Sequence, residues 1–259
     1  MQQIKSFLKS KGQKEKTIKT YCSVIGRTLR NLPESFNQED VENAFERMNL
    51  SPSTYNLYRT IFNFYTTKYK GFSLSFTKAK VNRPLPTYVT KEELKAVLDT
   101  IPNLKHKLGI ALAYGSGLRV YEICRIKKHD ISPGSQTLMV KEGKGGKDRN
   151  TIIPTITLNA LEFYLNKTKD NPSPYLFSTY RGHISERSFQ ERLSKAIRDS
   201  KISKAFGMHD LRHSFAINLL NKKVDIETVR KLLGHSSLRT TQIYLQCMTT
   251  DLTALAKIA

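Results

Sequence analysis

The spacing of apolar residues predicts a mainly helical N-terminal part. Over the first 70 residues, apolar side chains recur three or four positions apart, which is the period of an amphipathic α-helix. The third and fourth stripes begin near polar residues that can cap a helix. These helices would form a small bundle. The first helix is expected to contain the stripe Ile4, Phe7 and Leu8, and the second to run from about 17 to 32. The third is expected to start near Asn37, and the fourth at Ser51 or Ser53.

A proline-containing segment separates this bundle from the rest of the chain. Pro84 and Pro86 disfavour a helix and stiffen an extended backbone over residues 79–89. Thr90 and Glu93 then have the spacing of a capping box that opens the next helix. The predicted domains are therefore residues 1–78 and 90–259, with residues 79–89 as the linker.

The second part combines helices with a small β-structure. Helices are expected within residues 105–127 and again after about 158. Between them, Thr137–Val140 and Thr151–Ile153 have the composition of strands, and the glycine-rich turn 142–149 joins them. The predicted fold class is mainly α with a small antiparallel β-sheet.

Net charge indicates the kind of partner. Lys and Arg number 43 against 22 Asp and Glu, which gives a formal net charge of +21 and a pI near 9.9. The excess is present both in the first 90 residues and in the remainder, so it is not confined to a tail. A solvated, lysine-rich surface is the simplest alternative. A polyanionic partner, and nucleic acid above all, accounts better for an excess of this size.

Cysteine usage and hydropathy bear on the compartment. Cys22, Cys124 and Cys247 are odd in number and far apart, which argues against a disulfide framework and against a zinc site. No apolar run is long enough to span a bilayer, and the first residues have no signal-peptide core. The expected compartment is the reducing cytoplasm.

His209 and Arg212 form the first pair that could carry chemistry. They lie three positions apart in a predicted helix, so they share a face that flanks the apolar stripe containing Leu211. Considered alone, a surface pair that binds an ion explains them better than catalysis does. His235 follows Gly234, which suits a left-handed residue at a helix end. An interaction with terminal carbonyls would also explain this histidine.

Three further residues are equally ambiguous when each is considered alone. Tyr244 lies in a short amphipathic segment, where a tyrosine usually belongs to a core. Arg119 follows two glycines and could pair with Glu122 one turn later. Lys144 lies in the turn 142–149, which lacks the spacing of a phosphate-binding P-loop and instead indicates a basic hairpin.

The order of these residues is more informative than any one of them. Gly-Leu-Arg ends at Arg119, Gly-Lys-Gly is centred on Lys144, and Leu-Gly-His ends at His235, before Tyr244. Together with His209-x-Leu-Arg-His213, this set resembles the tyrosine recombinase (phage integrase) family. The motifs span residues 115–244. Three departures are Gly207-Met208 before the first histidine, Asn221-Lys222-Lys223 where a glycine is usual, and Leu245-Gln246 after the tyrosine.

The resemblance implies a two-domain clamp around DNA and a set of catalytic roles. Tyr244 would attack the phosphodiester and form a 3′-phosphotyrosine, while Arg119 and Arg212 hold the non-bridging oxygens. Lys144 would protonate the leaving 5′-oxygen. His209 would assist proton transfer from the tyrosine, and His235 would hydrogen-bond the phosphate. Neither a metal nor another cofactor is required.

The resemblance also implies double-stranded DNA and other copies of the chain as partners. We expect a tetramer on two DNA sites, with a C-terminal helix 251–259 that packs either on its own domain or on a neighbouring protomer. The alternatives are a type IB topoisomerase, a non-catalytic DNA-binding relative and a generic nucleic-acid binder. Among recombinases, an Xer-like resolvase is favoured over an integrase, because no room remains for an additional DNA-binding domain. The expected contacts to the DNA backbone are Lys5, Lys9, Lys16, Lys19, Lys147 and Arg149.

Overall fold

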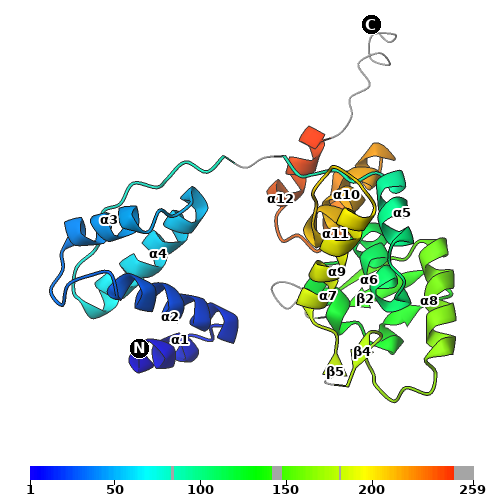
Figure 1. The fold of residues 1–259 in the computed structure, drawn as a ribbon, viewed down its shortest axis with the longest axis horizontal. Helices are drawn as coiled ribbons and strands as arrows, with labels where there is room; N and C mark the ends of the chain where they lie inside the picture. The colour runs from blue at the N-terminus through cyan, green and yellow to red at the C-terminus, as the bar shows by residue number, and fades with distance from the viewer. Residues whose placement is uncertain (83–84, 142–147, 181, 248–259) are drawn as a thin grey trace, which may run out of the picture. The chain divides into compact units, whose positions relative to one another are not determined.

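The chain folds into two compact units in a computed structural model that describes residues 1–82, 85–141, 148–180 and 182–247. The first unit is Met1–Pro84 and the second is Leu85–Ala259 (Figure 1). The division between them falls within the segment 79–89 that was predicted to be a linker. Each unit has its own apolar core.

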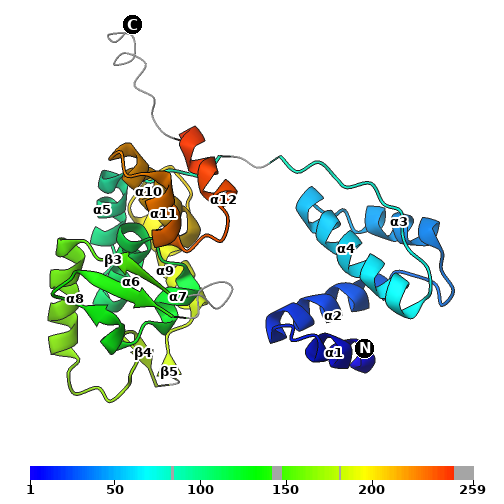
Figure 2. The same ribbon diagram turned by 180° about the vertical axis from the view of Figure 1, so that it is seen from behind.

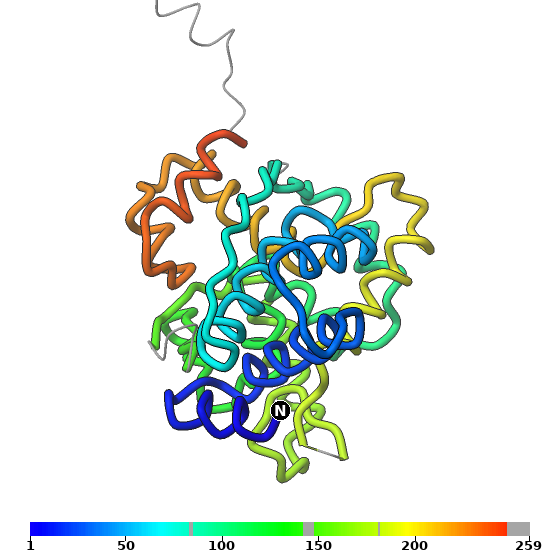
Figure 3. The backbone as a smooth tube through the Cα atoms, turned by 90° about the vertical axis from the view of Figure 1, so that its left-hand side faces the viewer, coloured from blue at the N-terminus to red at the C-terminus, as the bar shows by residue number. Residues whose placement is uncertain are grey.

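The N-terminal unit is a bundle of four helices whose path can be followed in Figure 3. Its core is rich in aromatic rings from α3 and α4. Phe45 lies with its ring centroid 5.8 Å from that of Tyr55 and 6.2 Å from that of Phe62, in edge-on geometry. The helices are α1 Gln2–Ser10, α2 Glu15–Leu29, α3 Gln38–Arg47 and α4 Pro52–Tyr69.

Side-chain amides hold the extended chain that follows α4 against the bundle. Asn56 pairs with Ala79 in both directions, because its Nδ2 donates to the carbonyl oxygen at 2.8 Å and its Oδ1 accepts the N–H at 3.0 Å. The Oδ1 of Asn63 accepts the N–H of Leu74 at 2.7 Å. Side chains of the bundle therefore pair several backbone groups of this extended chain, as far as Ala79.

The C-terminal unit packs helices around a three-stranded antiparallel sheet with strand order β1-β2-β3. Helix α10 contacts α6, α9, α11 and the 3₁₀ helix η2, and α8 packs against α6 on the outer side (Figure 2). The helices are α5 Lys91–Asp99, α6 Leu104–Ser116, α7 Val120–Arg125, η1 Lys128–Asp130, α8 Thr155–Lys167, α9 Glu186–Asp199, α10 Met208–Asn221, α11 Ile226–Leu233, α12 Arg239–Gln242 and η2 Ile243–Cys247. The strands are β1 Ile131–Ser132, β2 Thr137–Val140, β3 Arg149–Ile152, β4 Ser178–Thr179 and β5 Gly182–His183.

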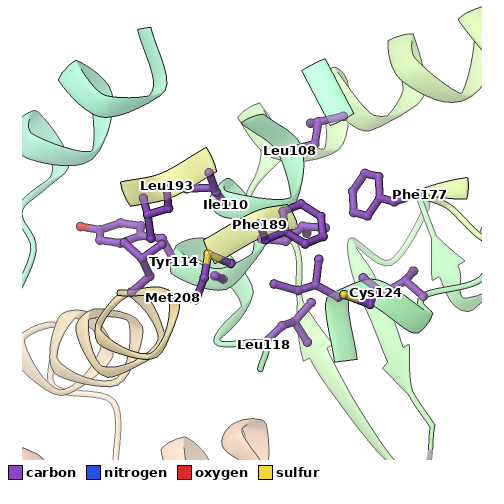
Figure 4. Packing of buried hydrophobic residues seen from close by; sticks show 14 of the residues in the cluster. Leu108, Ile110, Tyr114, Leu118, Cys124, Phe177, Phe189, Leu193 and Met208 are labelled. Atoms are coloured by element: carbon purple, nitrogen blue, oxygen red, sulfur yellow. The ribbon is translucent and has the colours of Figure 1, made fainter. Parts of the chain in front are cut away.

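Helix α6 lies in the middle of the core of this unit. Figure 4 shows side chains of α6, α7, α9 and α10 meeting there. Gly109 allows the closest approach, because a Cβ at that position would lie 2.1 Å from the ring of Phe189. The packing fixes α6 and α10 relative to each other, and three candidate catalytic residues follow α6 or lie in the first half of α10, namely Arg119, His209 and Arg212.

Local sequence signals predicted much of this architecture. The mainly helical fold with a small antiparallel sheet is confirmed, and so are the helix start near Asn37 and the capping box at Thr90. Strand β2 has the predicted bounds, whereas β3 starts two residues before the predicted strand. No helix in the described part of the chain is long and apolar enough to cross a bilayer.

Lys223 lies in the segment 221–223, which lacks the glycine that is usual in the family. Its φ of +62° lies in the left-handed region, and its N–H donates to the carbonyl oxygen of Leu220 at 2.8 Å. The N–H of Val224 reaches Leu219 at 3.1 Å, which completes a C-terminal cap of α10. The turn therefore forms without glycine, at the conformational cost that an L-residue bears in this region.

We expect the Lys223→Gly variant to raise the unfolding free energy of the C-terminal unit by about 0.5–1 kcal/mol, because glycine adopts this conformation without a Cβ clash. Urea-dependent hydrogen exchange of peptides from α10 would measure the change. Lys222→Gly is the matched control, since φ is −83° at that position and no gain is expected. Equal effects of the two substitutions would contradict the proposed strain.

Candidate active site

Gly117 lets the chain that leads to the first candidate arginine pass close to α10. The residue ends α6 with φ +65°, and a Cβ there would lie 2.3 Å from the ring of Phe215. Only glycine fits this left-handed turn against α10. The chain then enters α7 at Arg119, whose side chain is 23% exposed. The close packing of the turn thus sets the position of this guanidinium.

Arg212 is buried between two helix ends. It is only 1% exposed, and its guanidinium donates to the carbonyl oxygen of Gly117 and to that of Leu233, both at 2.5 Å. These carbonyls end α6 and α11 and have no partner within their own helices. The prediction that Arg212 flanks the buried face is therefore wrong, because helix-end carbonyls solvate its charge inside the core. Burial lowers the pKa of Arg212 to about 9, which leaves it protonated at neutral pH.

One buried carboxylate faces three guanidinium groups. Glu122 accepts the N–H of Arg119 at 2.8 Å and its Nη1 at 2.9 Å, and it accepts two bonds from Arg149 at 2.8 and 2.7 Å. Arg212 lies 3.8 Å away. Burial alone would raise the pKa of Glu122, but Arg149 and the other hydrogen bonds lower it to about 2. The cluster keeps an excess of positive charge, as an anion-binding site requires.

Arg149 has a different role from the predicted one. It was expected to contact a DNA phosphate, but its side chain is 7% exposed and bonded to Glu122. Its Nε also donates to the carbonyl oxygen of Leu232 at 2.9 Å, two residues before the glycine that ends α11. These contacts connect β3 with α7 and α11, and they favour a buttressing role over contact with DNA.

His235 is fixed just beyond the end of α11. Gly234 ends this helix with φ +65°, as its sequence position predicted. The imidazole Nδ1 lies 3.0 Å from the Oγ1 of Thr241, and Arg230 donates to the carbonyl oxygen of His235 at 2.6 Å. Burial, and then the neighbouring arginines, lower the pKa of His235 to about 3. The ring is therefore neutral and oriented.

His209 lies at the open side of the cluster. It is exposed and lines a pocket of about 420 Å³ together with Arg119, Tyr121 and Met208. Partial desolvation of its ring by the neighbouring residues, followed by the charges of Arg212 and Arg119, lowers the pKa of His209. This pocket is large enough for a phosphate group and has a guanidinium in its wall.

Tyr244 is buried rather than presented to solvent. It is 2% exposed, and its hydroxyl lies 2.8 Å from the Nδ1 of His213. Its ring is stacked at 24° to that of His235, with 6.3 Å between the centroids. Burial raises the pKa of Tyr244, while Arg212 and Arg119 act in the opposite direction. The sequence motif contained His213, but nothing in its spacing distinguished it from His209 as the partner of the tyrosine.

Five of the six predicted catalytic residues lie in the described part of the chain, and contacts or charge effects link all five there, together with His213. His209 belongs to the same group through its ring, whose centroid is 4.4 Å from that of His213. Lys144, Lys147 and the tail 251–259 lie outside the described residues. Four predicted DNA contacts of the N-terminal unit are exposed on α1 and α2, namely Lys5, Lys9, Lys16 and Lys19. Among the described residues, no group of three or more His, Cys, Asp or Glu side chains is placed to hold a metal ion.

Comparison with known families is consistent with this geometry. The model of the phage integrase family matches residues 87–250, which is more than half of the chain. The chain belongs to the phage integrase family. The match covers every described candidate catalytic residue from Arg119 to Tyr244.

Family relatives resemble this chain in sequence and in fold. Tyrosine recombinase XerA of Pyrococcus horikoshii is 38% identical over 192 residues, which are 71% of this chain and 66% of that protein. Tyrosine recombinase XerC of Halalkalibacterium halodurans is 34% identical over 67% of this chain and 61% of that protein. The chain thus matches about two thirds or less of the length of these curated relatives.

Solved structures of recombinases resemble the fold of this protein over nearly its whole chain. A crystal structure of XerH site-specific recombinase, bound to its palindromic difH substrate after cleavage, matches with a TM-score of 0.77 and 23% identity. It covers 93% of this chain and 79% of that one. A lambda integrase dimer bound to a core site matches with a TM-score of 0.74 and 19% identity, over 94% and 75% of the two chains.

Proposed function

We propose that this protein is a site-specific DNA recombinase that cuts and rejoins DNA through a covalent bond between Tyr244 and a 3′-phosphate. The observation that carries the proposal is the position of the tyrosine. Its hydroxyl lies in one cluster with a buried Arg212 and an oriented His235, beside a pocket lined by Arg119 and His209. A hydroxyl and two guanidinium groups of one chain lie close together, which supports their proposed roles as nucleophile and phosphate-binding groups.

Cleavage in this proposal is an in-line displacement at phosphorus. The Oη of Tyr244 forms the new bond to phosphorus as the bond to the 5′-oxygen breaks. Arg119 and Arg212 stabilise the negative charge that grows on the non-bridging oxygens. If the Thr241 hydroxyl donates to Nδ1 of His235, the ring proton lies on Nε2 and is available to the phosphate. Lys144 retains its predicted role as the proton donor to the leaving oxygen.

Rejoining reverses these bonds with a different strand. A 5′-hydroxyl from a second duplex attacks the phosphotyrosine, and the tyrosine hydroxyl is released. The covalent intermediate conserves the energy of the phosphodiester, so neither ATP nor a metal is needed. Two such exchanges pass through a Holliday junction.

Double-stranded DNA and further copies of the chain are the proposed partners. The net charge and the exposed lysines of α1 and α2 support backbone contacts. Among the structural neighbours is a lambda integrase tetramer bound to a Holliday junction, which supports a tetramer here, and the names XerA and XerC of relatives support Xer-like resolution. Exchange of residues 251–259 between protomers stays a prediction. All three cysteines lie in described segments and are free, consistent with the reducing cytoplasm.

Trapping the covalent intermediate tests the proposal. Duplexes selected by binding from a random pool would be nicked a few nucleotides 3′ of candidate cuts, so that the released fragment diffuses away. We expect an adduct that survives denaturation, with DNA attached to the peptide containing Tyr244, and strand exchange between two duplexes. Tight binding without an adduct would favour a non-catalytic DNA-binding protein. Relaxation of supercoiled DNA without exchange would favour a type IB topoisomerase.

A further inference from the structure

His213 makes the contact with the reacting oxygen that the motif suggested for His209. Its Nδ1 lies 2.8 Å from the Oη of Tyr244, and the two rings are tilted at 54° with centroids 5.4 Å apart. His209 lies one helical turn earlier and faces the pocket that contains Arg119. The two histidines of α10 therefore face different sides of the site.

We propose that His213 accepts the proton of Tyr244 during attack on the DNA phosphate, a role that rests on the proposed recombinase function. As the Oη–H bond breaks, the proton moves to Nδ1 of His213 and the oxygen forms its bond to phosphorus. The bond from phosphorus to the 5′-oxygen breaks, and that oxygen takes a proton from the general acid. In the rejoining step the proton returns from His213 to the tyrosine.

The surroundings of His213 suit a neutral acceptor. Burial, and then its histidine and arginine neighbours on α10, lower its pKa to about 4, so the ring is neutral near pH 7. A neutral imidazole can take a proton, whereas an imidazolium cannot. The titratable and charged groups near it on α10, on η2 and beyond α11 are His209, Asp210, Arg212, Tyr244 and His235.

His209 is less suited to direct contact with the tyrosine. Its ring meets that of His213 edge to face, with 4.4 Å between the centroids, and the described residues include no hydrogen bond between His209 and Tyr244. Its position beside Arg119 instead favours contact with the phosphate. The structure thus favours different contacts for two histidines of one motif, the tyrosine for His213 and the phosphate for His209.

Single-turnover cleavage of the nicked duplex tests the role of His213. We expect His213→Ala to slow formation of the adduct about 100-fold or more, which is within the usual range for the loss of an acid–base group. His213→Gln should be equally slow, because an amide can accept the hydrogen bond but cannot take the proton. His183→Ala removes a partly buried histidine of β5 and should cleave at the wild-type rate.

Two further measurements separate proton acceptance from simple positioning. A substrate with sulfur in place of the leaving 5′-oxygen needs no proton on that side, so the defect of His213→Ala should persist with it. On this substrate the variant rate should rise about tenfold per pH unit between pH 6 and 9, because attack then depends on the fraction of tyrosinate. The wild-type rate should change little over the same range.

Several outcomes would overturn this role. A wild-type rate in His213→Ala, a faster rate, or restoration by glutamine would each reduce the hydrogen bond to a structural contact. If His213→Ala cleaved the sulfur substrate at the wild-type rate, His213 would act on the leaving 5′-oxygen rather than on the tyrosine. If the wild-type protein itself forms no adduct on any selected duplex, the recombinase proposal fails instead, and the two failures are thereby distinguished.

Discussion

Tyr244→Phe is expected to abolish covalent attachment to DNA while the protein continues to bind duplexes. The substitution removes one oxygen atom and leaves the ring in the cluster that it shares with His235. Without the nucleophile, adduct formation should fall by about 10⁴-fold or more. Affinity for DNA should stay within about twofold, because in the proposed complex lysines and arginines rather than this buried hydroxyl contact the phosphates.

The structure also supplies the control for this experiment. Tyr180 is 90% exposed, so Tyr180→Phe makes the same chemical change at the surface and should cleave normally. Loss of the buried hydroxyl leaves His213 without one partner, at a cost of about 1 kcal/mol, which a folded unit can tolerate. An adduct formed by Tyr244→Phe would show that another residue attacks the DNA.

Mixing variants tests whether one chain supplies the whole site. Tyr244 lies with Arg212 and His235 of its own chain, so cleavage should occur in cis. A mixture of Tyr244→Phe and Arg212→Lys protomers should therefore form no more adduct than either variant alone. Recovery of adduct in the mixture would instead mean that the tyrosine reaches the phosphate held by a neighbour.

Local sequence signals could predict the elements and the members of the site. Capping residues such as Thr90 and Asn37 act within one turn, and Gly234 ends a helix for a purely local steric reason. The chain order of Arg119, His209 and the other motif residues indicated a common site by resemblance. These signals are all short-range or depend on order along the chain.

The burial and pairing of the site residues could not be predicted in this way. Arg149 and Glu122 are 27 positions apart, and Arg149 reaches a carbonyl 83 positions away. Helical periodicity places Arg212 beside an apolar stripe, but it does not reveal that two helix ends enclose its charge. His213 and His209 lie one turn apart on α10, so only the packing of η2 decides which of them meets the tyrosine.

The second large effect is expected at Glu122. Glu122→Gln keeps the shape of the side chain, but it removes the negative charge that forms ion pairs with Arg149 and Arg119. The new NH₂ group also faces guanidinium donors. Breaking a buried ion pair from one side typically costs about 3–5 kcal/mol, because the remaining charges stay buried without compensation. Much of the C-terminal unit's stability would be lost.

The loss of stability in Glu122→Gln should depend on pH in a defined direction. Because the pKa of Glu122 falls from 4.5 to about 2 in the folded chain, its charge stabilises the fold above pH 4.5, and this contribution disappears as the pH drops towards 2. Urea-dependent hydrogen exchange of α10 peptides should therefore give a constant difference between wild type and Glu122→Gln from pH 5 to 7, and a shrinking one below pH 4.5.

A matched surface pair separates burial from the chemical change. Glu227 pairs with Arg230 at 2.6 Å, but its side chain is 47% exposed, so water screens the pair and Glu227→Gln should change stability little. If both substitutions had the same small effect, the buried carboxylate would not be what holds the arginines in place. We expect a large loss of stability in Glu122→Gln alone, together with slower cleavage under conditions where the variant is still folded. This combination would mean that the charge that stabilises the C-terminal unit also positions Arg119 for the phosphate.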